Sequence, residues 1–489
     1  MCTAVQLDAR PHTEANLALE EAVASTRAAL DNGAELVVLP EGTWPAYYLG
    51  DMACHTWPWP ALAEALSPFQ DLARAYQAVI VTGLMEPAPG GVYNAAYVID
   101  RDGSSSRAAA KRFLWDFESR WTVRETSSTP VDTSLGKLGV LICADARAPE
   151  IARQLTLHGA EVLLDPTAWV TGEPDPTKRT NPQYEHLLGT RALENGLWAI
   201  AANKVGIERE TIVYCGRSTI VDAMGLHQVS APPDQPDRIT AEVPFGPATP
   251  PAVRKPKLYQ MLGMPTHSTP AAEFLESPDI PRDLMRRVVV GHSGSTTDET
   301  VTTAVELGAD LIISAQHTLP AEPEHHESFP ATVTVAPGTA RYNDGEQTVV
   351  WTSVHDDSTP EAGSVAPTSL GRVTVLFGDD ILLPEPARVL MLQGADVILW
   401  ADAQAEYYQV AATRALENRL YVIALPRLQT GAAAVFNPAG NQVGKSALGQ
   451  TFTYVTLNLA ESRQKQMAPG TDVLWGRQPE HYTNLYTEL

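Results

Sequence analysis

The sequence predicts an α/β fold in which buried strands alternate with helices. Residues 135–169 show the pattern most clearly, with an apolar run at 138–142, helical spacing of apolar residues over 148–157 and a second strand at 161–164. The same alternation runs through the first half of the chain. It recurs in the second half, which predicts two tandem copies of one fold.

Length, charge and cysteine usage restrict the class of protein. A chain of 489 residues is too long for one ordinary core, and its apolar content of 44% is that of a folded protein. The formal net charge of −23 disfavours nucleic acids and anionic membranes as partners, and no apolar run approaches the length of a membrane span. The cysteines lack framework spacing and follow no secretory segment, so we expect a soluble cytoplasmic protein: Cys2, Cys54, Cys143 and Cys215.

A carboxylate ends the second predicted strand. A helix over about 14–32 stops at Gly33, and the strand 35–39 then runs into Pro40 and Glu41. Position alone also fits a solvated turn carboxylate. The following loop is rich in aromatic residues, which line a pocket or pack on a neighbouring subunit.

Two further side chains of reactive types, a lysine and a cysteine, also follow predicted strands. Lys111 comes after the predicted strands 79–84 and 93–99, and an isolated lysine is usually solvated. Cys143 stands where a strand passes into a helix, near backbone N–H groups that lower a thiol pKa and hold an oxyanion. The alternative is a small buried hydrophobic residue.

These residues lie in motifs that resemble the nitrilase, or carbon-nitrogen hydrolase, superfamily. The resemblance covers most of residues 1–265, and the motifs keep the family's order and spacing: LPEG with Glu41, KRFLWDFE with Lys111, GVLICADARAPE with Cys143, then GAEVLLDPTAW and ARALENGLWAIAANK. It implies a four-layer α-β-β-α sandwich. It also implies a catalytic set of Glu41, Lys111 and Cys143.

The chemistry suits those residue types. A thiolate forms a covalent acyl-enzyme, a carboxylate moves protons, and the Lys111 ammonium with the Ala144 N–H stabilises the tetrahedral intermediate. The family's second carboxylate is expected to be Glu118, with Glu125 as the weaker candidate. The expected substrate-lining side chains are Tyr47, Tyr48, Trp115 and Trp169. No metal or organic cofactor is expected.

The dipeptide after the cysteine bears on the branch of the family. True nitrilases typically place Trp-Glu there, whereas this chain has Ala144 and Asp145, closer to amidases and carbamoylases. We therefore expect hydrolysis of a small amide or N-carbamoyl compound, with release of ammonia or an amine. The alternatives are nitrile hydrolysis by the same residues, acyl transfer to an amine, and a non-catalytic ligand-binding scaffold.

The second half repeats the motifs of the first. LGKLGVLICAD returns as LGRVTVLFGDD, HGAEVLL as QGADVIL, and TRALENGLWAIA as TRALENRLYVIA. We predict a catalytic domain at 1–265, a linker at 266–284 and a second domain at 285–489.

The second copy lacks the chemistry. The repeat places Gln316 opposite Glu41 and Gly378 opposite Cys143, and residues 348–370 contain no lysine. Neither an amide nor a glycine supplies a base or nucleophile. We interpret a cluster at 324–327, with His317 nearby, as a solvated loop rather than a metal site.

The resemblance implies a structural role for a degenerate copy. Members of the family usually pair through a helical face, and we expect the fused second copy to take the partner's place. We therefore predict an intramolecular pseudo-dimer, open to further self-association, that binds a small-molecule substrate.

Overall fold

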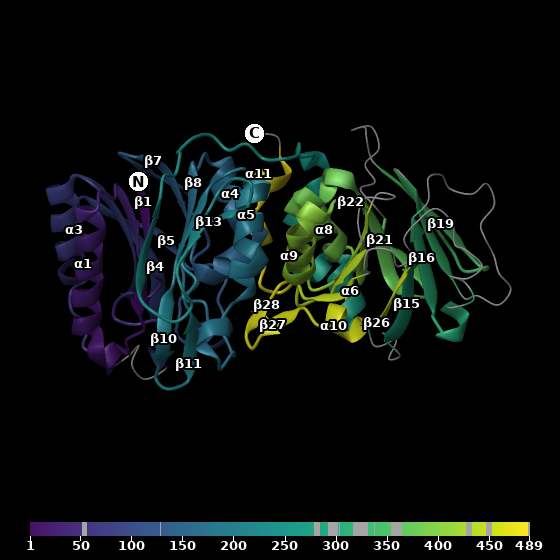
Figure 1. Ribbon diagram of the computed structural model, residues 1–489, viewed down its shortest axis with the longest axis horizontal. Helices are drawn as coiled ribbons and strands as arrows, with labels where there is room; N and C mark the ends of the chain where they lie inside the picture. The colour runs from purple at the N-terminus through teal and green to yellow at the C-terminus, as the bar shows by residue number, and fades with distance from the viewer. Residues whose placement is uncertain are drawn as a thin grey trace. The chain divides into compact units, whose positions relative to one another are not determined.

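The chain forms two compact units, seen here in a computed structural model (Figure 1). Unit 1 comprises Met1–Pro251 with Ala468–Thr471, and unit 2 comprises Ala252–Met467 with Asp472–Leu489. The structure describes residues 1–50, 56–127, 129–277, 284–291, 302, 304–315, 331–336, 338–353, 364–426, 433–445 and 452–487. No helix within these ranges combines the length and the apolar character that crossing a membrane requires.

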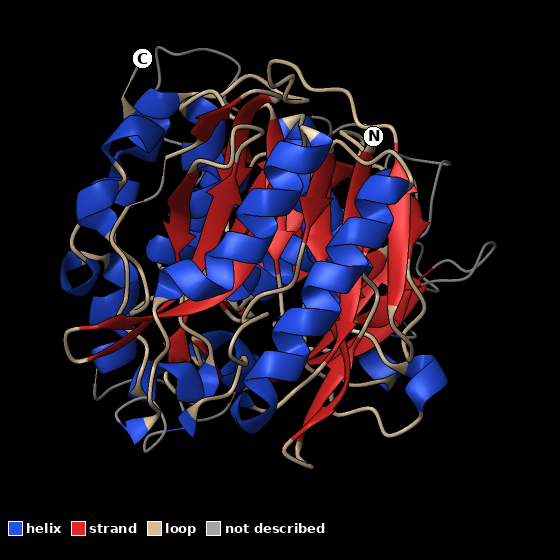
Figure 2. Cartoon of the chain, turned by 90° about the vertical axis from the view of Figure 1, so that its left-hand side faces the viewer, coloured by secondary structure: helices blue, strands red, loops and turns tan. Residues whose placement is uncertain are grey.

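The first sheet of unit 1 is mixed. Its strands follow the order β11-β10-β1-β2-β3-β4-β5, with β14 also paired to β1. Their bounds are β1 Cys2–Asp8, β2 Leu36–Val38, β3 Val79–Ala88, β4 Gly91–Ile99, β5 Ser105–Ala110, β10 Lys204–Glu208, β11 Ile212–Cys215 and β14 Asp237–Ala241. Helices α1 (Ala15–Asp31) and α3 (Leu62–Tyr76) cover its outer face, where their apolar stripes share one core with the strands (Figure 2).

The second sheet of unit 1 carries the nucleophile strand. Its order is β13-β12-β9-β8-β7-β6, and β7, β8 and β9 are parallel. The bounds are β6 Val131–Thr133, β7 Gly136–Val140, β8 Val162–Pro166, β9 Ala199–Ala202, β12 Thr219–Val221 and β13 His227–Ser230. Helices α4 (Pro149–Leu157) and α5 (Leu188–Asn195) pack on it. The expected helix–sheet–sheet–helix sandwich is confirmed.

Unit 2 repeats this plan within its described residues. One sheet has the order β19-β18-β17-β16-β15-β26 and the other β20-β21-β22-β23-β24-β25, with an apolar core drawn from both. The first comprises β15 Met285–Gly291, β16 Leu311–Ala315, β17 Thr332–Ala336, β18 Thr339–Asn343, β19 Thr348–Thr352 and β26 Phe452–Asn458. The second comprises β20 Ala366–Thr368, β21 Gly371–Phe377, β22 Val397–Ala403, β23 Tyr421–Pro426, β24 Ala434–Phe436 and β25 Gln442–Lys445, with α8 (Pro384–Leu392) and α9 (Tyr408–Asn418) packed on it.

The described residues between the copies, 252–277, are structured. The chain from Ala252 onward clusters with unit 2, where η6 (Pro256–Gly263) packs on α8 and Arg254 Nε lies 2.8 Å from Glu385 Oε1. The expected linker 266–284 contains α6 (Pro270–Glu276), whose first turn is capped by the Thr269 hydroxyl.

The repeated TRALEN motif has a structural explanation. In α5 the buried Arg191 guanidinium lies 2.7 Å from Glu194 and donates from Nε to the Ala146 carbonyl beside the nucleophile turn. In α9 Arg414 lies 2.7 Å from Glu417 and donates to Ile381. Both copies therefore use one buried ion pair to hold the turn that follows the equivalent strand, β7 in unit 1 and β21 in unit 2.

We expect Glu194→Ala to destabilise unit 1 by about 3–5 kcal/mol, because the Arg191 charge loses its buried partner. Urea unfolding measures this. The matched control is Asp71→Ala, which breaks an exposed pair of the same spacing with Arg74 and should change stability little. Equal effects of the two substitutions would contradict the interpretation.

Candidate active site

A buried ion cluster lies at the ends of two strands of the first sheet. Glu41 follows β2 and Lys111 follows β5, and Lys111 Nζ lies 2.6 Å from Glu41 Oε1. Its second contact is Glu118 Oε1, also at 2.6 Å. Asn94 on β4 donates to the same Glu41 oxygen at 2.6 Å. The structure therefore brings together three of the four predicted catalytic side chains.

The cluster keeps its lysine charged. Burial alone lowers the Lys111 pKa, but the carboxylates of Glu118 and Glu41 outweigh it and raise that pKa well above its ordinary value. Burial raises the Glu118 pKa, which the ammonium opposes. The site thus holds a fixed positive charge between the carboxyl groups of Glu41 and Glu118.

Cys143 begins a tight turn, η3 (Cys143–Arg147), directly after β7. Its φ of 51° lies in the left-handed region, a conformation that is costly for a non-glycine residue and is found at functional sites. Two side chains hold the turn: Asp165 Oδ1 accepts the Cys143 N–H at 2.6 Å, and Gln183 Nε2 donates to the Cys143 carbonyl at 2.9 Å. These two bonds fix the backbone of Cys143 and with it the position from which the thiol side chain extends.

The environment of the thiol differs from the expectation. Cys143 is only 6% exposed, and burial followed by the Glu41 charge raises its pKa well above the ordinary value. Lys111 opposes this shift without reversing it. The expected lowering of the thiol pKa by backbone N–H groups is therefore wrong, because one of those N–H groups is taken by Asp165 and desolvation dominates.

The structure distinguishes the two candidates for the second carboxylate. Glu118 touches Lys111 and also accepts the Trp115 N–H at 2.9 Å. Glu125 lies 3.6 Å from Arg107 instead. Of the two candidates, Glu118 is therefore the one that joins Glu41 beside the lysine.

The predicted lining residues take different positions. The Tyr47 ring lies 5.7 Å from Lys111 Nζ, and Trp115 stacks on the Arg147 guanidinium at 4.4 Å. Tyr48 packs among Phe117 and Trp121, and Trp169 is buried, with its backbone N–H donated to Asn203 Oδ1. Ala144 is buried as the second residue of η3, where N–H groups of a helix lack an intrahelical acceptor.

Several residues of the site were not predicted from the sequence. Asn94 is a polar residue within the apolar run of β4, which is a usable signal. Asp165, Gln183 and Arg147 give none, because their contacts with the nucleophile turn and with each other depend on folding. Lys204, whose ammonium donates to the Gly42 carbonyl at 2.6 Å, supports the Glu41 loop in the same unforeseen way.

Unit 2 has other residues at the matching positions. In unit 1, the Lys111 N–H donates to the Asn94 carbonyl, one step beyond the paired strand residues Ala95 and Ala110. In unit 2, the Ser353 N–H donates to the Gly338 carbonyl, one step beyond the paired residues Thr339 and Thr352. Ser353 therefore occupies the position of the lysine. Gly378 occupies the cysteine position with the same φ of 51°.

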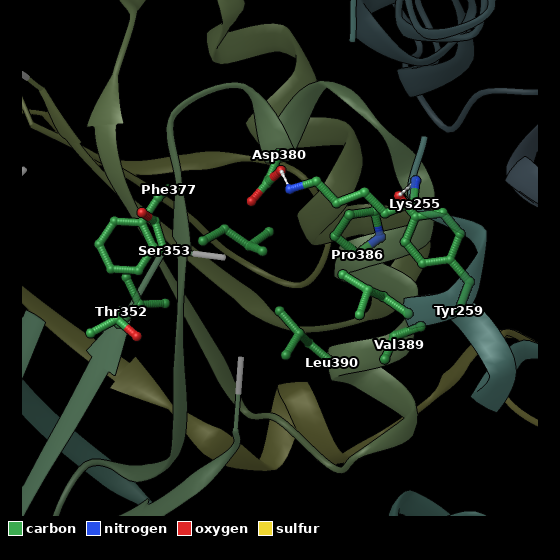
Figure 3. A pocket seen from close by; sticks show the side chains of 12 residues that line it. Lys255, Tyr259, Thr352, Ser353, Phe377, Asp380, Pro386, Val389 and Leu390 are labelled. Atoms are coloured by element: carbon green, nitrogen blue, oxygen red, sulfur yellow. Dashed lines mark hydrogen bonds and ion pairs between the residues drawn. The ribbon is translucent and has the colours of Figure 1, made fainter. Parts of the chain in front are cut away.

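A pocket beside these positions of unit 2 is mainly apolar (Figure 3). Ser353, Phe377 and side chains of α8 line it, with Lys255 4.0 Å from Asp380. Gln316, His317 and residues 324–327 lie outside the described ranges.

Alkylation of Cys143 by iodoacetamide should report the raised thiol pKa. Because the neutral thiol predominates at neutral pH, we expect the rate to rise about tenfold per pH unit up to pH 9. Mass mapping separates this site from the buried Cys2, whose pKa burial raises to about 11. A plateau below pH 8 would contradict the prediction.

Comparisons with known proteins identify the family of the chain. The family model "Carbon-nitrogen hydrolase" matches residues 2–250 and again 282–466. The deaminated glutathione amidase of Synechocystis is 31% identical over 245 residues, covering 46% of this chain and 85% of the relative. A probable nitrilase of Schizosaccharomyces pombe is 29% identical over 194 residues, covering 39% and 68%.

Solved structures give matches over about half of the chain. An amidase from Nesterenkonia sp. AN1 has 24% identity and a TM-score of 0.44, covering 50% of this chain and 92% of that one. A carbon-nitrogen hydrolase from Helicobacter pylori has 27% identity and a TM-score of 0.40, covering 48% and 87%. By its two family matches, this chain belongs to the carbon-nitrogen hydrolase family and is a carbon-nitrogen hydrolase in which the family unit occurs twice.

Proposed function

We propose that the protein hydrolyses a small amide or N-carbamoyl compound through a thioester on Cys143. The observation that carries the proposal is the buried Lys111 ammonium held 2.6 Å from both Glu41 and Glu118, in the unit that contains Cys143. Glu41 offers a base, Lys111 a fixed cation and Cys143 a nucleophile, and these are the parts that acyl transfer through a thiol requires.

In the first half-reaction Glu41 takes the proton of the Cys143 thiol as sulfur attacks the carbonyl carbon. The raised thiol pKa favours this coupled transfer over a preformed thiolate. The oxyanion is stabilised by Lys111 and by the Ala144 N–H. When the C–N bond breaks, Glu41 returns the proton to the leaving nitrogen, which departs as ammonia or an amine.

In the second half-reaction water replaces the amine. Glu41 removes a proton from water, whose oxygen attacks the thioester carbon, and the C–S bond breaks. The proton returns to the sulfur, so the acid product leaves and Cys143 is restored. Glu118 keeps Lys111 in place throughout.

The acyl group is proposed to carry a carboxylate. Arg147 is 5% exposed, and among the described residues it bonds only neutral amides, with Nε 3.0 Å from Gln183 Oε1 and Nη2 3.5 Å from Asn181 Oδ1. Burial lowers its pKa to about 10. A buried guanidinium without a carboxylate partner is costly, and a substrate carboxylate offers the bidentate partner that it lacks.

The position of Arg147 supports that assignment. Gln183 links its guanidinium to the Cys143 carbonyl, and Trp115 links its other side to Glu118. A carboxylate bound there is therefore close to both halves of the catalytic set.

The second copy is proposed to be non-catalytic and to pair with the first as an intramolecular pseudo-dimer. Support for the first part comes from Gly378 and Ser353 at the cysteine and lysine positions. Support for the second comes from the sequence repeat, in which core motifs persist while reactive residues do not.

Ammonia release from amides, N-carbamoyl amino acids and nitriles tests the reaction. We expect turnover of amides or N-carbamoyl compounds by the wild type, and Cys143→Ala should lower it by at least about 10³-fold. Residual turnover near the wild-type rate would place chemistry outside unit 1. An intact-mass adduct that only an added amine discharges would indicate acyl transfer.

Paired substrates test the role of Arg147. For an amide with a carboxylate in its acyl part, Arg147→Gln should raise KM about 10- to 100-fold, because a charged bond is lost. The uncharged amide of the same shape should show little change in KM. Equal effects on both substrates would assign Arg147 to the structure of the turn alone.

A further inference from the structure

We propose that Thr471, encoded far beyond the catalytic motifs, is a positioning residue for Glu118. This inference rests on the proposed function of the Glu41, Lys111, Cys143 and Glu118 set, and it adds a residue from the C-terminal end of the chain.

The starting point is a hairpin formed by β27 (Gln466–Ala468) and β28 (Thr471–Asp472). Its tip, Ala468–Thr471, clusters with unit 1. Thr471 is 2% exposed, and its hydroxyl oxygen accepts the Asp116 N–H at 2.8 Å and donates to the Leu114 carbonyl at 2.9 Å. One side chain therefore binds the backbone on both sides of Trp115.

That backbone segment sets the position of Glu118. The Trp115 N–H donates to Glu118 Oε2 at 2.9 Å, while Oε1 contacts Lys111. Asp116 has a φ of 48°, a left-handed conformation that few residues other than glycine adopt. The Thr471 bond to the Asp116 N–H stabilises this conformation at the start of η2 (Asp116–Arg120), the turn that carries Glu118.

A second contact supports a close fit. Gly470 has a φ of +74°, and a Cβ built there would lie 2.8 Å from Ser119 Oγ and 3.3 Å from the Asp116 carbonyl. The tip therefore approaches η2 at a distance that only glycine permits without rearrangement. Two successive residues of the tip thus contact the turn on either side of Glu118.

The consequence is a division of the site along the chain. Glu41, Lys111 and Cys143 come from the first copy. Thr471, whose hydroxyl holds the Glu118 turn, comes after β26, the last strand of the two sheets of unit 2. This gives the second half of the chain a role in catalysis through a hydroxyl that takes no part in the chemistry itself.

The test compares Thr471→Val, which keeps the volume but removes both hydrogen bonds, with Thr471→Ser, which keeps the hydroxyl. Misplacing a catalytic group by about 1 Å costs on the order of 10²-fold, so we expect Thr471→Val to lower kcat roughly 10- to 100-fold with a smaller change in KM. Thr471→Ser should restore most of the rate. The control Thr26→Val removes a buried hydroxyl from α1, which bonds only Ala22 among the described contacts, and should leave kcat unchanged.

A double variant tests whether Thr471 acts through Glu118. If it does, Thr471→Val should have little effect once Glu118→Gln is present, because residues that act as a unit are not additive. The alkaline limb of the pH–rate profile should also move to lower pH in Thr471→Val, since Glu118 raises the Lys111 pKa.

Hydrogen–deuterium exchange gives a readout independent of turnover. The amides of residues 114–120 should exchange faster in Thr471→Val than in the wild type, and at the wild-type rate in Thr471→Ser. Unchanged exchange, or equal losses of kcat with and without Glu118→Gln, would overturn the proposal. Absence of wild-type turnover together with faster exchange in Thr471→Val would overturn the proposed function and leave the positioning role supported.

Discussion

The site depends on one buried ammonium between two carboxylates. Removing Lys111 from water carries a large desolvation penalty, which its contacts with Glu41 and Glu118 offset only while both geometries are kept. When all three groups are ionised, the cluster carries a net negative charge. Burial, followed by the Glu41 charge, raises the pKa of the neighbouring thiol, and the proposed mechanism therefore has a base remove its proton during attack.

Comparing the two copies distinguishes the features that the fold requires from those that the proposed chemistry requires. Both copies keep the buried Arg–Glu pair of the TRALEN helix, and both keep a left-handed residue directly after β7 or β21. In unit 1 that residue is Cys143, whose strain is balanced by the bonds to Asp165 and Gln183. Gly378 adopts the same φ at little cost. The turn is therefore a property of the architecture, and only its side chain makes it reactive.

The sequence predicts the parts of the site that depend on local order. Glu41 and Cys143 follow predicted strands, which β2 and β7 of the two sheets confirm, and the resemblance to the family implied their roles and that of Glu118. Asp165, Arg147 and Thr471 were out of reach because their roles come from contacts between distant segments. The error about the thiol pKa has the same origin, since burial depends on the folded sandwich and not on the residues beside Cys143.

The net charge of the protein and the buried charge of Arg147 act over different distances. A formal net charge of −23 disfavours an anionic substrate at long range, yet salt screens exposed charges beyond about 8 Å at physiological ionic strength. Arg147 is buried and is screened far less. The proposed preference for a carboxylate therefore depends on the desolvated Arg147 guanidinium, and the acidic surface has little influence on it. For this reason selectivity should survive changes of surface charge and be lost with the guanidinium.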